Sequence, residues 1–207
     1  MNDGNQLSRD LLRDKLKAIG FRGDVFFFPV IESTNDFARK LARKSGTGRA
    51  VIAADYQTAG RGRRGRTWRN QAGDGICLSL LIRAGAGAGN ALITLVTAVA
   101  AVEALETVTG LNPKIKWPND LILNGKKAGG ILIEQIPDRA GRDIIIIGIG
   151  INVNTPDFPA ELRDRAISLR QILGRVLNRA DLIAEITRRM ENAYPALTDR
   201  SELDNIL

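Results

Sequence analysis

The chain contains no histidine among its 207 residues. Histidine-based acid–base catalysis, Ser-His-Asp triads and most zinc sites are therefore excluded. It has a single cysteine, Cys77, which lies inside an apolar run and is predicted to be a small core residue. One cysteine cannot form a disulfide framework, so we expect a reducing, cytoplasmic setting.

Long hydrophobic segments and aromatic residues are also scarce. The longest apolar stretch, 91–105, contains Thr94, Thr97 and Glu103, which predicts that it is too short and too polar to span a membrane. The segment 1–17 is polar and charged, so no signal peptide is expected. Aromatic residues make up only 5% of the chain, which disfavours a module that binds nucleic acid by base stacking.

The excess of positive charge is concentrated in one segment. The formal net charge is +7, and leaving out the five arginines between positions 61 and 69 reduces it to about +2. A protein that binds nucleic acid by charge alone would spread its lysines and arginines over a face. The basicity therefore indicates a local anion site.

A chain with 44% hydrophobic residues can bury a sizeable core, and we expect one domain over residues 1–207. We predict helices at 8–19, after 33–36, and at 91–108, 168–173 and 180–197. We predict strands at 25–31, 50–56, 75–83, 114–117, 121–123, 126–135 and 143–153. Several strands are joined by hairpin-length links, so the fold class is predicted as α+β with a mixed sheet.

Local signals mark the ends of several of these elements. Ser8 and Asn178 are predicted N-caps, and Gly110 is a predicted helix stop. Asn124-Gly125 predicts a tight hairpin turn, and Pro29 indicates an edge strand or a bulge. A flexible turn is expected at 85–89 and a proline-bearing loop at 154–166.

Two helices are predicted from their apolar residues. Ser33 to Asp36 is similar to a capping box, and the helix that follows should bury Phe37 and Leu41. In the alanine-rich segment 91–108, one apolar stripe is expected along the helix. Its members are Leu92, Leu95, Val99 and Val102.

The segment Gly60–Arg66 alternates glycine with four arginines. Crowded guanidinium groups repel and glycine adds backbone freedom, so we expect a mobile loop until an anion neutralises it. On its own, the run fits a solvated basic turn, an RNA-binding arginine–glycine segment or a phosphate site. It occurs once, between two strands, with Gln57 and Trp68 beside it, which favours a small-ligand site.

Two further clusters accompany strand ends. Lys116–Asp120 reads first as an ordinary turn; in the functional interpretation Asp120 helps hold magnesium and Asn119 meets phosphate or sugar. Lys127 precedes Gly129-Gly130, whose missing side chains would let a carboxylate or phosphate approach.

Five motifs occur in the order Ser33–Asn35, Gln57–Trp68, Lys116–Asp120, Lys127–Glu134 and Gly148–Asn152. Together they resemble the biotin protein ligases, also called biotin–[acetyl-CoA-carboxylase] ligases. The resemblance covers residues 20–155 strongly and the C-terminal helices weakly. It implies a fold like the catalytic domain of class II aminoacyl-tRNA synthetases and biotin synthetases, with a mixed, largely antiparallel sheet flanked by helices.

The resemblance also implies a reaction with ATP, biotin and Mg²⁺. Biotin and ATP would give biotinyl-5′-AMP, and a lysine of a biotin carboxyl carrier domain, as in acetyl-CoA carboxylase, would take the biotinyl group. Arg61, Arg63 and Lys127 would be catalytic. The biotin site would comprise Ser33, Thr34, Asn35, Gln57, Arg61, Gly62, Arg63 and Lys127. The nucleotide site would comprise Arg66, Trp68, Asn119 and Asn152, with Asp120 near the metal.

The same resemblance sets expectations about domains and partners. Only about 20 residues precede the catalytic part, so we expect no N-terminal winged helix and no nucleic-acid partner, and an SH3-like C-terminal domain is absent or truncated. A homodimer formed through sheet edges is compatible with the family, and no residue decides it. The rival readings are a lipoate–protein ligase, whose pocket binds no ureido group, and a nucleic-acid-binding module that uses the arginine loop.

Overall fold

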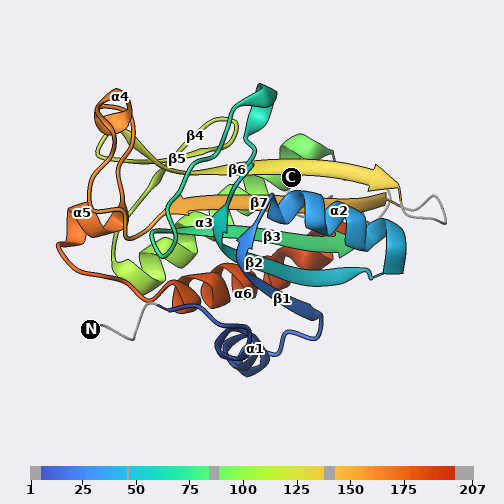
Figure 1. Ribbon diagram of the computed structural model, residues 1–207. Coiled ribbons are helices and arrows are strands. Elements are labelled where there is room, and N and C mark those ends of the chain that lie inside the picture. Colours follow the sequence, from blue (N-terminus) through green and yellow to red (C-terminus); the bar gives the residue numbers. More distant parts are fainter. Residues whose placement is uncertain (1–5, 46, 84–88, 138–142, 199–207) are drawn as a thin grey trace.

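The computed structural model describes residues 6–45, 47–83, 89–137 and 143–198, and a seven-stranded sheet forms its centre (Figure 1). The strand order is β1-β2-β3-β7-β6-β5-β4. Only β1 and β2 pair in parallel, and every other neighbouring pair is antiparallel. The predicted α+β class with a mixed, largely antiparallel sheet is therefore confirmed.

The strands and helices lie close to their predicted positions. The strands are β1 (Asp24–Ile31), β2 (Arg49–Gln57), β3 (Gly75–Arg83), β4 (Lys114–Lys116), β5 (Asp120–Leu123), β6 (Lys126–Pro137) and β7 (Asp143–Asn152). The helices are α1 (Arg9–Ala18), α2 (Thr34–Ser45), α3 (Asn90–Thr109), α4 (Ala160–Arg163), α5 (Leu169–Leu173) and α6 (Arg179–Thr198), with a 3₁₀ turn, η2 (Arg63–Gly65). The helix α4 lies in the segment that was expected to be a loop.

Both faces of the sheet are covered. The larger core joins α1, α3 and α6 to one face, and a smaller cluster joins α2 to the other (Figure 1). Successive isoleucines of β7 alternate between them: Ile145 and Ile147 face the larger core, whereas Ile144 and Ile146 face α2. A strand buried on both faces needs apolar residues at every position, which explains the four consecutive isoleucines.

The local signals at element ends are confirmed. Ser8 caps α1 and accepts a hydrogen bond from the Leu11 amide, and Gly110 ends α3 in the left-handed region. Asn124 and Gly125 both have positive φ, as a two-residue hairpin turn requires. The edge position of β1 agrees with its proline. The predicted turn at 85–89 lies outside the described residues except for its last glycine.

The predicted apolar stripe of α3 is confirmed only in part: Val102 packs against the core, whereas the two middle residues point outward. Leu95 and Val99 are 43% and 41% exposed, whereas the buried face consists largely of small residues such as Ala98 and Ala101. Small residues let α3 approach α6 and the sheet closely. Of its bulkier residues, Ile93 and Leu105 are buried, whereas Leu95 and Val99 are left outside. In α2 the fully buried apolar residues are Ala38 and Ala42, while the predicted Phe37 and Leu41 are partly buried and pack against the smaller cluster.

By length and composition, α3 is the one helix of the described residues that could cross a membrane. The shorter stretch 91–105 was expected to be too short and too polar for that. In the folded chain α3 packs against α6 and β6, and a core helix of a globular domain meets the same criterion.

Candidate active site

A cavity of about 600 Å³ opens between the arginine segment, the N-terminus of α2 and the glycines of β7. We call residues 57–75, which run from the last residue of β2 to the first residue of β3, the excursion (Figure 1); several of its arginines line the cavity. Twelve of the predicted site residues line this cavity: Ser33, Thr34, Asn35, Gln57, Arg61, Gly62, Arg63, Arg66, Trp68, Asn119, Asp120 and Lys127. Residues distant in sequence thus converge on one site.

The floor of the cavity is neutral and hydrogen-bonded. Gln57 Oε1 accepts from the Thr34 amide at 2.8 Å and lies 3.1 Å from Thr34 Oγ1. Both side chains are buried, as are Ser33 and Asn35 at the start of α2. Ser33 Oγ accepts from the Asp36 amide at 3.4 Å, which is the serine half of the predicted capping box; the Asp36 carboxylate pairs with Arg61 instead.

A second polar layer lies beneath this floor and was not predicted. Ser79, in the middle of β3, has its Oγ 2.7 Å from Thr34 Oγ1 and 2.5 Å from Asn35 Oδ1. Glu134 of β6 accepts a hydrogen bond from Asn35 Nδ2 at 2.8 Å. These contacts fix the conformation of the two side chains at the start of α2.

The arginine segment forms a compact turn. Thr67 bridges back to Arg61, and the Gly62 amide donates to the Arg66 carbonyl at 2.7 Å. Arg64 has a φ of 57°, and this left-handed residue turns the chain inside η2. Its mobility before an anion binds stays a prediction.

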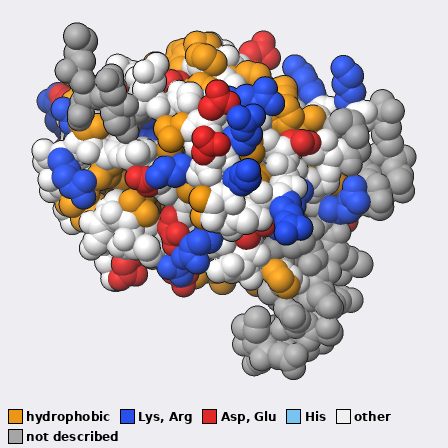
Figure 2. Space-filling view, turned by 90° about the horizontal axis from the view of Figure 1, so that it is seen from below, with side chains coloured by type: hydrophobic (Ala, Val, Ile, Leu, Met, Phe, Trp, Pro, Cys, Tyr) orange, Lys and Arg blue, Asp and Glu red, His pale blue; other side chains and the backbone are white. Residues whose placement is uncertain are grey.

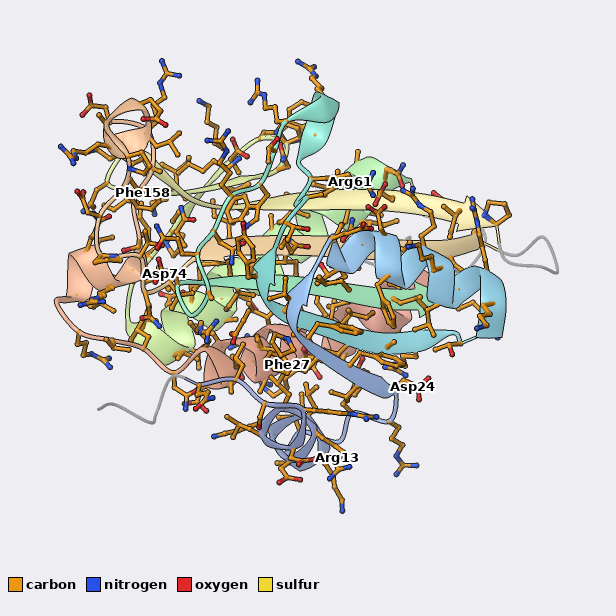
Figure 3. The ribbon with its side chains drawn as sticks, viewed as in Figure 1. Arg13, Asp24, Phe27, Arg61, Asp74 and Phe158 are labelled. Atoms are coloured by element: carbon orange, nitrogen blue, oxygen red, sulfur yellow. The ribbon has the colours of Figure 1, made fainter. Side chains whose placement is uncertain are left out.

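Carboxylates offset the charge at the base of this segment. Arg61, labelled in Figure 3, forms ion pairs with Asp36 at 2.7 Å and Glu134 at 3.1 Å. Arg39 of α2 also pairs with Glu134. Arg63 donates to Asn119 Oδ1 at 3.3 Å, so it reaches across the cavity mouth. An anionic ligand would compete with these carboxylates for Arg61.

The opposite wall carries Lys127 and Asp120, which form an ion pair at 2.7 Å. Asn119 Nδ2 donates to the Ile131 carbonyl at 3.0 Å, which holds this loop against β6. Within the ranges that the structure describes, no group of three His, Cys, Asp or Glu side chains could hold a metal ion. Asp120 is thus a lone carboxylate shared with a lysine, and its role at a metal stays a prediction.

Two glycines of β7 make room for cavity side chains. A Cβ atom on Gly150 would lie 2.4 Å from the Trp68 ring, and one on Gly148 would lie 2.5 Å from Asn35 Oδ1. The Trp68 indole therefore rests on the bare backbone of the strand. Its Nε1 is buried and finds no hydrogen-bond partner among the described residues.

Comparisons with known proteins agree with this arrangement. The model of the biotin/lipoate A/B protein ligase family matches residues 27–152. The chain belongs to this family. It is 41% identical over 192 residues to the bifunctional ligase/repressor BirA of Bacillus spizizenii, covering 91% of this chain and 59% of BirA. It is 40% identical over 132 residues to the biotin–[acetyl-CoA-carboxylase] ligase of Paracoccus denitrificans, covering 62% and 55% of the two chains.

A solved member of the ligase family has the same fold. The biotin protein ligase from Aquifex aeolicus in complex with biotin and ATP superimposes with a TM-score of 0.73 at 32% identity, covering 84% of this chain and 72% of that one. The present chain spans 59% of the length of BirA.

Cys77 differs from its prediction in one respect. It is buried, as expected for a core residue, but it also lines the cavity. Burial raises the pKa of its thiol to about 12. The thiol is therefore neutral near pH 7 and is a weak nucleophile.

Asn152 is the one predicted site residue that does not line the cavity. Its Nδ2 lies 3.3 Å from the carbonyls of Lys127 and Ile167 and donates to them. The amide thus braces the backbone at Lys127. A nucleotide contact for Asn152 stays a prediction.

A buried arginine holds both ends of the excursion. Arg179, at the start of α6, is 1% exposed and pairs with Asp55 of β2 at 2.8 Å. Its Nη1 also donates to the Gly75 carbonyl at 3.1 Å, where β3 begins. Burial raises the pKa of Asp74, beside this junction, and Arg179 and Arg170 partly oppose that shift. No sequence motif indicated this link.

Proposed function

We propose that this chain is an ATP-dependent ligase that activates biotin as biotinyl-5′-AMP and transfers the biotinyl group to a lysine of a biotin carboxyl carrier domain. One observation carries the proposal: a single cavity combines a neutral, hydrogen-bonding floor with a cationic wall. The names of the relatives, which include a biotin–[acetyl-CoA-carboxylase] ligase, support the same substrates. The following paragraphs derive what the residues would do.

The first step joins two anions. The biotin carboxylate attacks the α-phosphorus of ATP, a new carboxyl–phosphorus bond forms, and pyrophosphate leaves. Arg61, Arg63 and Lys127 would offset the repulsion between the reactants and stabilise the charge on the α-phosphate. Arg61 and Lys127 already contact carboxylates, so the ligand anions would replace Asp36 and Asp120 as their partners. No general base is needed, because the carboxylate is ionised near neutral pH.

The neutral floor suits the ureido ring of biotin. That ring is uncharged and presents two N–H donors and one carbonyl acceptor, which buried hydroxyl and amide groups can match without the desolvation cost of an ion. Ser33, Thr34, Asn35 and Gln57 supply such groups. The dithiolane ring of lipoate has no N–H, and this difference favours biotin over the lipoate alternative.

The excursion would then protect the intermediate. The mixed anhydride reacts with water, so a loop that closes over it prevents hydrolysis and holds it until the acceptor lysine arrives. The lysine amine, after losing its proton, attacks the biotinyl carbonyl, and AMP leaves as the amide forms. Trp68 and Arg66 on the excursion line the cavity where the nucleotide would lie.

Magnesium would enter with ATP. The described residues contain no metal cluster, and Asp120 is the one carboxylate lining the cavity. Mg²⁺ commonly binds through one or two protein carboxylates together with substrate phosphates, and Asp120 fits that limited role. When bound, the ion would neutralise charge on the pyrophosphate.

The cellular setting and assembly are further parts of the proposal. The one thiol is buried and free, as expected in a reducing cytoplasm. Acidic and basic side chains are interspersed among the described residues of the face seen from below in Figure 2, so that face presents no continuous basic surface. Light scattering and a salt-dependent DNA-binding assay would test the homodimer and the missing nucleic-acid activity.

ATP–pyrophosphate exchange tests the function directly. We expect exchange that depends on biotin and that lipoate does not support, followed by labelling of one lysine on an added biotin carboxyl carrier domain. Exchange with lipoate alone would favour the lipoate ligase, and salt-sensitive nucleic-acid binding without exchange would favour the binding module.

A further inference from the structure

Ser79 is a polar residue in a strand that is otherwise apolar from Ile76 to Ile82, and it is completely buried. A buried hydroxyl is costly unless it forms hydrogen bonds. The hydroxyl of Ser79 bonds to the side chains of Thr34 and Asn35, both of which line the cavity. Its neighbour across the sheet is Gly148, whose missing side chain gives Asn35 its space. The hydroxyl is therefore placed to serve the cavity.

Glu134, Asn35, Ser79 and Thr34 form a row of hydrogen-bonded side chains, and the direction of each hydrogen bond in this row follows from Glu134. An ionised carboxylate only accepts hydrogen bonds, so Asn35 must turn its Nδ2 toward Glu134, at 2.8 Å. The Asn35 Oδ1 then faces Ser79 Oγ at 2.5 Å. Two oxygens that close require a proton between them, and only the Ser79 hydroxyl can supply it.

The next link is determined in the same way. A serine hydroxyl has one proton, and Ser79 has donated it to Asn35. The 2.7 Å contact between Ser79 Oγ and Thr34 Oγ1 therefore needs the proton of Thr34. Gln57 Oε1, at 3.1 Å from Thr34 Oγ1, is the other acceptor within reach of that proton, but it already accepts the Thr34 amide at 2.8 Å, and the contact with Ser79 is the shorter of the two. The Thr34 hydroxyl is left with lone pairs for the cavity.

We infer that Ser79 is a positioning residue that, together with Glu134, makes Thr34 an obligatory hydrogen-bond acceptor. The cavity then selects ligands that present an N–H donor to Thr34. This inference rests on the proposed function, in which the donor is one of the two ureido N–H groups of biotin. A ligand with an oxygen at that place would set two acceptors against each other.

Isothermal titration with isosteric ligands tests the inference. The probes are biotin and its two cyclic carbamate analogues, in which oxygen replaces one or the other ureido N–H. For the analogue that wild type rejects more strongly, we expect binding at least about 30-fold weaker than for biotin, because a buried acceptor is left unsatisfied. In Ser79→Ala the Thr34 proton loses its partner at 2.7 Å and can rotate between Gln57 Oε1 and the cavity, so Thr34 can also act as a donor to the ligand. The ratio of the two dissociation constants should then fall about tenfold.

A second variant reverses the donor–acceptor direction of these hydrogen bonds without removing Ser79. In Glu134→Gln, Arg39 and Arg61 would attract the oxygen of the new amide, because both donated to the carboxylate. The nitrogen of that amide would then face Asn35, whose own amide turns round and donates to Ser79. Thr34 regains its proton, and the ratio should fall here too, even where Ser79→Ala does not fold.

Thr97→Val is the matched control, because it removes a fully buried hydroxyl that bonds only within α3. Its ratio should equal that of wild type. Parallel weakening of both ligands in Ser79→Ala and Glu134→Gln, with an unchanged ratio, would overturn the inference and leave the proposed function intact. Failure of wild type to bind biotin at all would instead reject the proposed function.

Discussion

Gly150→Ala is predicted to displace Trp68 from the cavity wall. The added Cβ would lie 2.4, 2.7 and 2.8 Å from three atoms of the indole ring, whereas carbon atoms in contact are normally about 3.5–4.0 Å apart. The ring must therefore retreat by about 1 Å or more, and such overpacking costs about 1–3 kcal/mol of stability. If the nucleotide stacks on Trp68, a displacement of that size can lower the rate by about 10².

Tryptophan fluorescence and kinetics report the two halves of this prediction. The chain has two tryptophans, and Trp117 is 74% exposed, so a Trp117→Phe background leaves Trp68 as the only tryptophan fluorophore. Gly150→Ala in that background should red-shift the emission and raise the KM for ATP in pyrophosphate exchange more than the KM for biotin. Gly89→Ala is the control, because its Cβ would meet nothing within 4 Å. Wild-type emission together with a wild-type KM for ATP would refute the reasoning.

Four further predictions follow from the site. Lys127→Ala should lower adenylate formation by about 10²–10³, and pyrophosphate release near the level of a Lys126→Ala control would reject Lys127 as an essential charge. Arg63→Gly should still form adenylate but release it, and unchanged labelling of bystander lysines would contradict this. Cys77 should resist iodoacetamide at pH 8 until urea unfolds the chain, because its pKa is raised to about 12; rapid alkylation of the folded protein would disprove it. Arg179→Met should lower the free energy of unfolding by about 3–5 kcal/mol in urea titrations, because it leaves the partly buried carboxylate of Asp55 unpaired. A loss below about 1 kcal/mol would show that the Arg179–Asp55 ion pair contributes little to stability.

The sheet could be predicted because its signals are local. The two positive-φ residues of the turn at 124–125 and the apolar run of β7 each specify their own segment, whatever the rest of the chain does. The exposed face of α3 could not be predicted in this way. That helix is apolar on nearly all sides, and which side is buried depends on the small residues that fit against α6.

The residues of the candidate site likewise fall into those that local sequence indicates and those whose role depends on the tertiary structure. Residues inside compact motifs, such as Gln57, Arg61 and Lys127, could be predicted to lie at one site, because they and their neighbours in sequence form a recognisable pattern. Ser79 and Glu134 were assigned no role, since their importance arises from strand register and from the direction of hydrogen bonds. A lone serine within an apolar strand was the available signal for the first of them.

The contacts of Arg179 with Asp55 and Gly75 have a consequence for the proposed ligase reaction. Because one guanidinium ties Asp55 of β2 to the first residue of β3, the two ends of the excursion would stay fixed if its tip, around η2, moves as predicted. Such a movement would admit substrates and release products without disturbing the neutral hydrogen-bonding groups of the cavity floor. Turnover speed and substrate selectivity could therefore change independently, the first through residues at the tip and the second through residues at the base.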